Sequence, residues 1–182
     1  MKAFKHFKTI TTHKFYVAKL CFAIGLYKQG LLHDLSKYMP CEFMTGVKYY
    51  QGNRSPNTQE RLERGFSEAW LHHKGANRHH WEFWVDFTRY GMFPAKMPYN
   101  YVLEMFCDRT AASIVYKGKD YTDGYPLVYY NNGKHSYIMH PVSRRALEHL
   151  LYYLNDHGLD ATLRYIKKNK DELKKQYDLE NE

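Results

Sequence analysis

The chain has 182 residues, 44% of them hydrophobic, and its 27 Lys and Arg against 19 Asp and Glu give a formal net charge of +8 at pH 7. This composition excludes an intrinsically disordered protein, and no run approaches the roughly 18 consecutive apolar residues that a membrane-spanning helix needs. Residues 1–6 contain no apolar signal-peptide core, so we expect one cytoplasmic domain over residues 1–182.

The charge and the cysteines limit the class of partner and site. A basic protein favours anionic partners, here small phosphorylated substrates and nucleotides. We do not favour nucleic acid, because much of the excess charge lies in lysine runs near the two ends, which are typical of solvated helix faces. Cys21, Cys41 and Cys107 are too widely spaced for a zinc ribbon or a disulfide framework. The oligomeric state stays open.

The first predicted helix covers residues 9–28, with Thr11 or Thr12 as its N-cap and Gly30 after its end. His13 recurs with apolar residues at helical spacing, which places this histidine on the buried stripe. A histidine in that position is either a hydrogen-bonded core residue or a ligand that faces inward.

The segment Gly30–Lys37 contains the pair His33-Asp34. The imidazole can bind a metal ion, and the neighbouring carboxylate can bind the same ion or bridge to a second. If the segment is helical, Lys37 lies within one turn of both and could meet an anionic oxygen of a substrate. The alternative is a polar helix end capped by Asp34.

Residues 40–50 form the next predicted helix, because Pro40 suits its first turn and Glu42 lies near its positive end. The loop at residues 51–56 carries Arg54, which either contacts an anion or is merely solvated.

The third predicted helix begins at Asn57 or Thr58 and ends near His73. Helical spacing turns His73 toward the interior and His72 outward or sideways.

Residues 72–82 contain four histidines within nine positions. Gly75 breaks the preceding helix, and Asn77 can cap another one. On that helix His80 shares a face with three aromatic residues, whereas His79 shares a face with acidic residues. We therefore predict His80 as the inward residue and His79 as a residue that orients a neighbour. An aromatic and polar surface cluster is the alternative.

A helix over residues 98–117 follows, and Asp108 lies on its apolar stripe. An unpaired carboxylate is costly there, so Asp108 needs either a salt-bridge partner or a metal ion. Glu104, one turn earlier, could support it.

The last third of the chain divides into an irregular, tyrosine-rich segment over residues 118–140 and two helices over 141–155 and 160–176. The irregular segment either covers a site or wraps the surface. A small hairpin is expected at Asn131-Asn132-Gly133.

Metal-capable side chains therefore occur in five helical regions, at ends or on inward faces. Each would cost desolvation energy unless it were satisfied by a partner. We predict an all-α fold in which these residues meet; they are His13, His33, Asp34, His73, His80 and Asp108.

The segment His33-Asp34-Leu35-Ser36-Lys37 resembles the HD-x-x-K element of the HD-domain superfamily of metal-dependent phosphohydrolases. His13 and Asp108 match the histidine of its first core helix and the aspartate of its last. Residues 73–82 also resemble a signature of an uncharacterised bacterial and phage family in or near that superfamily. The resemblance covers about residues 10–117, and Ser36 replaces a glycine that many members have.

The resemblance implies an HD-domain-like helical bundle around one or two divalent transition-metal ions. The ligands of a single ion correspond to His13, His33, Asp34 and Asp108. In binuclear members two further histidines, matched best by His73 and His80, hold a second ion that the Asp34 equivalent bridges. Nitrogen and oxygen ligands without thiolate suit Fe, Mn, Co, Ni or Zn.

We therefore expect hydrolysis of a phosphate ester or anhydride, with Asp34 and Lys37 as catalytic residues. The predicted substrate-binding residues are Lys37, Arg54, Asn77 and Arg78. Two alternatives remain: a di-iron oxygenase, which the same ligands would serve, and a non-catalytic module that contains metal and binds nucleotides.

Overall fold

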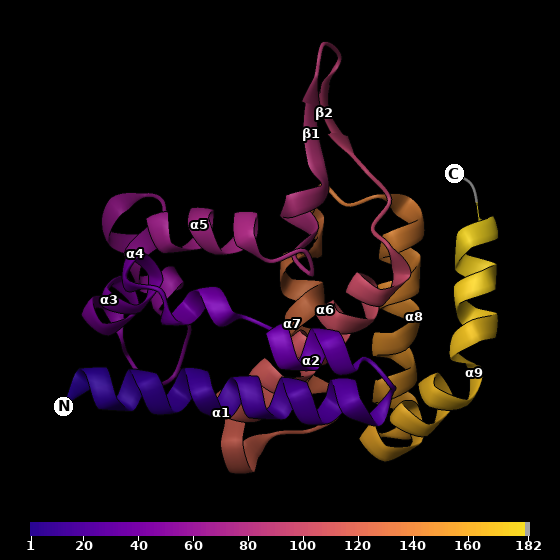
Figure 1. Cartoon of the computed structure of the whole chain (residues 1–182), viewed down its shortest axis with the longest axis horizontal. Coiled ribbons are helices and arrows are strands. Elements are labelled where there is room, and N and C mark those ends of the chain that lie inside the picture. Colours follow the sequence, from indigo (N-terminus) through magenta and orange to yellow (C-terminus); the bar gives the residue numbers. More distant parts are fainter. Residues whose placement is uncertain (181–182) are drawn as a thin grey trace.

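The computed structural model describes residues 1–180 and shows an all-α bundle with one small hairpin (Figure 1). Its α-helices are α1 (Lys2–Ala23), α2 (Tyr27–Leu32), α3 (Pro40–Tyr49), α4 (Pro56–Arg64), α5 (Glu68–Ala76), α6 (Tyr99–Lys117), α7 (Tyr125–Gly133), α8 (Pro141–His157) and α9 (Leu159–Leu179). Short 3-10 helices are η1 (Leu35–Tyr38), η2 (Trp81–Trp84), η3 (Gly118–Asp120) and η4 (Lys134–Ser136). The strands β1 (Val85–Thr88) and β2 (Gly91–Pro94) form an antiparallel hairpin. None of the helices within residues 1–180 is long and apolar enough to cross a membrane.

The hydrophobic core lies between α1, α6 and α8, with α9 against its outer side (Figure 1). Helix α8 buries a stripe of four leucines, as its spacing predicts: Leu147, Leu150, Leu151 and Leu154. Helix α6 is central and buries residues around most of its circumference. It therefore forms a fixed support for any side chain that it directs toward α1 or α5.

Helices α1 and α2 are separate because Gly25 adopts a left-handed conformation, with φ of +76°, and lets the chain reverse. Helix α2 then runs back along α1. The ammonium group of Lys14 on α1 donates hydrogen bonds of 2.7 and 2.8 Å to the backbone carbonyls of Leu31 and His33. These bonds fix the end of α2 to α1, so the residues that follow start from a fixed position.

Several predicted elements differ from the structure. The helix expected over residues 9–28 instead spans Lys2–Ala23, so Thr11 and Thr12 lie inside α1 and not at its N-cap. The helix expected from Asn57 or Thr58 to His73 is two helices, α4 and α5, because Gly65 ends α4 in a left-handed conformation. The prediction of a helix after Asn77 is wrong. Residues 81–84 form η2 instead, and the aromatic and β-branched residues beyond it form β1 and β2, which project from the bundle (Figure 1).

The segment over residues 118–140 is more regular than expected. It contains α7, whose first turn holds Pro126, a position that needs no backbone N–H donor. The hairpin predicted at Asn131-Asn132-Gly133 is therefore wrong, since these residues form the last turn of α7.

Gly46 on α3 allows α3 to approach α1 closely. A Cβ atom at this position would lie 2.2 Å from Nε2 of the buried His6 on α1. We expect Gly46→Ala to lower the free energy of unfolding by about 1–3 kcal/mol, because the buried ring cannot move aside freely. Urea denaturation followed by circular dichroism would measure it.

Gly75→Ala is the matched control, because a Cβ on this helical glycine of α5 has no atom within 4 Å. It should raise stability by about 0.5–1 kcal/mol through helix propensity. Equal effects of the two substitutions would contradict the close approach of α3 to α1.

Candidate metal centre

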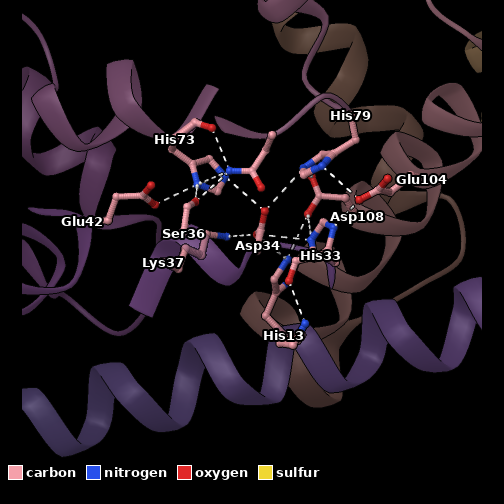
Figure 2. Close-up of polar contacts among 12 residues, drawn as sticks. His13, His33, Asp34, Ser36, Lys37, Glu42, His73, His79, Glu104 and Asp108 are labelled. Atoms are coloured by element: carbon pink, nitrogen blue, oxygen red, sulfur yellow. Dashed lines mark hydrogen bonds and ion pairs between the residues drawn. The ribbon is translucent and has the colours of Figure 1, made fainter. Parts of the chain in front are cut away.

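Asp34 lies at the centre of the polar cluster, in the turn between α2 and η1 (Figure 2). It is the one non-glycine residue in 1–180 with a positive φ, at +53°, a conformation that costs roughly 1–2 kcal/mol. This backbone turn directs the side chains of both His33 and Asp34 inward, and each residue is only 2% exposed.

The first group of potential ligands comprises His13, His33, Asp34 and Asp108, which offer ligand atoms within 4.8 Å of one another. His13 Nε2 lies 2.9 Å from Asp108 Oδ1, and His33 Nε2 lies 3.2 Å from Asp34 Oδ2. These residues come from α1, from the turn after α2 and from α6. The structure thus brings together the four residues that the sequence predicts for a single ion.

The second group comprises Asp34, His73, His79 and His80. His73 Nε2 and His79 Nε2 lie 3.3 and 3.6 Å from Asp34 Oδ1. Oδ2 of Asp34 faces the first group, whereas Oδ1 faces the second. The carboxylate is therefore placed to bridge two ions.

His79 is the main correction to the predicted site. Helical spacing placed it on an outer face, but the chain after Asn77 is not helical, and His79 is 1% exposed beside Asp34. His79 is a third histidine of the second group, beside His73 and His80, and it replaces neither of them as a potential ligand. His72 does face outward, where its Nδ1 contacts Oε1 of Glu42 at 2.6 Å.

Two glutamates hold the histidine rings from behind. Oε1 of Glu104 accepts a hydrogen bond from Nδ1 of His33 at 2.9 Å and lies 3.2 Å from Nδ1 of His79 (Figure 2). Oε2 of Glu42 accepts one from Nδ1 of His73 at 2.8 Å. A neutral ring with its proton on Nδ1 would present an unprotonated Nε2 toward Asp34, as metal-binding histidines do.

Glu104 was expected only to support Asp108, and Glu42 was expected only to lie near the positive end of its helix. Spacing alone could not reveal that they contact histidines far away in the sequence.

The donor atoms fit a bound cation. Several buried polar atoms in the cluster form no hydrogen bond within the part of the chain that the structure describes: Nε2 of His13, His33, His79 and His80, and both oxygens of Asp34. Two of these atoms have ion-pair contacts instead, Asp34 Oδ2 with Lys37 and His13 Nε2 with Asp108. Such atoms cost free energy when buried without a partner, and a metal ion would satisfy them together. Imidazole and carboxylate without thiolate suit Fe, Mn, Co, Ni or Zn.

The electrostatics of the cluster favour ionised carboxylates. Burial alone would raise the pKa of Asp34, but His33, Lys37 and His73 hold it well below its usual value. Lys37 Nζ lies 2.5 Å from Asp34 Oδ2. Burial and the neighbouring His79 and His73 hold the pKa of His80 well below its usual value, so its ring is neutral and able to bind a metal.

A cavity of about 710 Å³ opens onto the cluster. Five cluster residues form part of its wall: His13, Lys37, His73, His80 and Asp108. Three tyrosines of the segment over residues 118–140 also line it, namely Tyr125, Tyr129 and Tyr137, so this segment covers part of the site.

The four predicted substrate-binding residues differ in position. Lys37 and Arg54 line the cavity. Asn77 does not, because its amide donates hydrogen bonds to Ser36 Oγ at 2.8 Å and to the carbonyl of His73 at 2.8 Å. The guanidinium of Arg78 lies over the ring of Phe83, also outside the cavity wall. Asn77 thus links Ser36 to His73, and Arg78 lies outside the cavity wall, so the structure does not place these two residues with Lys37 and Arg54.

We expect the purified protein to bind two Mn²⁺ ions, one in each group. Glu104→Ala should weaken binding of both ions by about 10- to 100-fold, because Glu104 orients one histidine of each group. Isothermal titration calorimetry with Mn²⁺ and elemental analysis would measure affinity and stoichiometry.

Glu42→Ala is the matched control, since Glu42 supports only His73 of the second group. This substitution should weaken binding of the ion in the second group and leave binding of the ion in the first group unchanged. Glu104→Gln, which keeps a hydrogen-bond acceptor, should restore part of the lost affinity. Unchanged affinities in Glu104→Ala would show that the glutamate does not orient the ligands.

No curated protein and no solved structure gives a significant match. One family model matches residues 2–152, which include every residue of the two ligand groups. The chain belongs to this family, which is described as a family of unknown function (DUF5662).

Proposed function

We propose that the protein is a metal-dependent phosphohydrolase that cleaves a phosphate ester or anhydride, with nucleotides as the favoured substrate class. One observation carries the proposal: Asp34 is shared by two ligand groups, and Lys37 lies beside it on the wall of a cavity. The resemblance of residues 33–37 to the HD-x-x-K element supports the same reaction. We place the activity in the cytoplasm, where the three free cysteines would stay reduced.

The ligand residues would hold one or two ions of Fe, Mn, Co, Ni or Zn. Bound there, such ions supply Lewis-acid activation of water and of the phosphoryl group. The protein's part is to fix the ligands. Asp34 is held by the backbone turn and by Lys37, while Glu104 and Glu42 fix the histidine rings. A site arranged in advance loses little free energy to reorganisation during the reaction.

Lys37 is the residue best placed to act on the substrate. Its ammonium group carries three donors, and a single contact with Asp34 leaves others for phosphoryl oxygens at the cavity wall. Negative charge on those oxygens grows or shifts as the phosphorus–oxygen bond breaks, and a nearby fixed cation stabilises it.

The remainder of the cavity suits an organic group larger than phosphate. Trp70 and Trp81 contribute aromatic surface to its wall, and Arg54 contributes a cation. Its volume lies within the range of cavities that enclose small organic ligands. These features favour a nucleotide over an inorganic phosphate chain.

We expect the Mn²⁺-loaded protein to release phosphate from at least one member of a panel of nucleoside mono-, di-, tri- and cyclic phosphates. Lys37→Met should lower kcat/KM by about 100- to 1000-fold, because one stabilising cation is lost. Malachite-green assays with matched metal content would measure it.

Lys48→Met is the control, since Lys48 is an exposed lysine on α3 outside the cavity. No metal-dependent release across the panel would reject the proposal. Oxygen consumption by the iron-loaded protein would indicate a di-iron oxygenase instead, and nucleotide binding without turnover would indicate a binding module.

A further inference from the structure

One face of α6 forms a wall of the cavity and carries two different kinds of site. The wall residues recur at helical spacing: Met105, Asp108, Arg109, Ala112, Ser113 and Tyr116. Asp108 belongs to the first ligand group. Because successive helical residues point about 100° apart, Arg109 reaches a different part of the same cavity.

Arg109 lies on two tyrosine rings. Its guanidinium carbon is 5.3 Å from the ring centroid of Tyr137 and 5.6 Å from that of Tyr130. The hydroxyl of Tyr130 donates a hydrogen bond of 2.8 Å to Oε1 of Glu148, which fixes that ring. The arginine is therefore held in place by aromatic faces.

The guanidinium of Arg109 has no acceptor among the residues that the structure describes. Its Nε is buried without a hydrogen-bond partner, and no ion pair compensates its charge. Stacking uses the faces of the guanidinium plane and leaves its N–H groups, which point outward in the plane, available for an oxyanion. A half-buried arginine whose Nε has no partner is placed to donate to an anion that enters the cavity.

Arg61 on α4 also stacks on an aromatic ring, although its side chain is exposed. It lines the cavity, its guanidinium carbon lies 5.2 Å from the centroid of Trp70, and it too lacks an ion-pair partner within residues 1–180. Arg64, one turn away on α4, differs. Its Nη1 pairs with Glu60 at 3.0 Å and with Glu68 at 2.9 Å. Arg64 thus has acidic partners that Arg61 lacks.

Glu82 is the cavity residue that could compete as the anion. Its Oε2 is buried without a hydrogen-bond partner, and it forms no ion pair with Arg109 or Arg61. The carboxylate of Asp108 is engaged by His13 and His33 instead. The positive charges of Arg109 and Arg61 do act on Glu82 and lower its pKa, but burial has the larger effect and raises that pKa above its usual value. Neither acid forms an ion pair with either arginine.

We propose that Arg109, assisted by Arg61, forms a second subsite that binds a phosphate group of the substrate other than the one that is hydrolysed. The substrate would then carry at least two phosphate groups, one at Asp34 and Lys37 and one at Arg109. That assignment to a substrate rests on the proposed function, but the affinity of Arg109 for phosphate does not.

The test is isothermal titration calorimetry of inorganic phosphate into the full-length protein after metal removal with EDTA. The metal-free wild type should bind phosphate, and Arg109→Ala should weaken binding by about 10- to 100-fold, as expected for loss of charge-assisted hydrogen bonds. Arg109→Lys keeps the charge without the planar fork and should fall between the two. If Arg109→Ala fails to fold, Arg109→Lys still tests the role of Arg109 in phosphate binding.

Arg89→Ala is the matched control, because the guanidinium of Arg89 also lies over a tyrosine ring, that of Tyr90 at 4.6 Å, but in the exposed hairpin outside the cavity. It should bind phosphate like the wild type. Absence of phosphate binding by the metal-free wild type would overturn the proposal, as would equal affinities in Arg109→Ala and Arg89→Ala. A loss in Lys37→Met with none in Arg109→Ala would place the phosphate at the metal ligands and overturn it as well. None of these outcomes depends on phosphohydrolase activity.

Discussion

The burial of the Asp34 carboxylate is the constraint on which the rest of the site depends. An ionised carboxylate removed from water is expensive, and here the backbone is strained as well to put it there. Its two oxygens face different groups of imidazoles, and a lysine contacts one of them. Such an arrangement is stable only with positive charge nearby. The histidines, Lys37 and the second layer of glutamates follow from that requirement.

The cluster has more negative than positive charge of its own. Asp34, Asp108 and Glu104 lie within it, whereas Lys37 is the permanent cation in contact. The pKa of His33 shows the consequence: burial would lower it, but Asp34, Asp108 and Glu104 raise it well above its usual value. Either a proton on His33 or a divalent cation in the cluster would offset this excess of negative charge. The same excess therefore favours metal binding.

Sequence periodicity identified the residues that lie on regular helices. His13, His73 and Asp108 are positions where a polar group recurs on an apolar stripe, and each faces the cluster. The same reasoning failed for His79, because a helical template was applied to a segment that forms a turn, η2 and a hairpin. The roles of Glu42 and Glu104 depend on tertiary contacts across 31 and 71 positions, which single-sequence patterns do not carry.

The structure shows where the positively charged side chains lie, which the composition cannot. A net charge of +8 suggested anionic partners without saying where they bind. Part of the positive charge lines one cavity, as Lys37, Arg54, Arg61 and Arg109, and the same cavity is lined by Asp108, whose carboxylate contacts histidines. Cations held near a ligand cluster of opposite sign would repel a bound metal unless an anion lay between them. The phosphorylated substrate that we propose has the charge to occupy that position, between the ligand groups and the arginines of the same cavity.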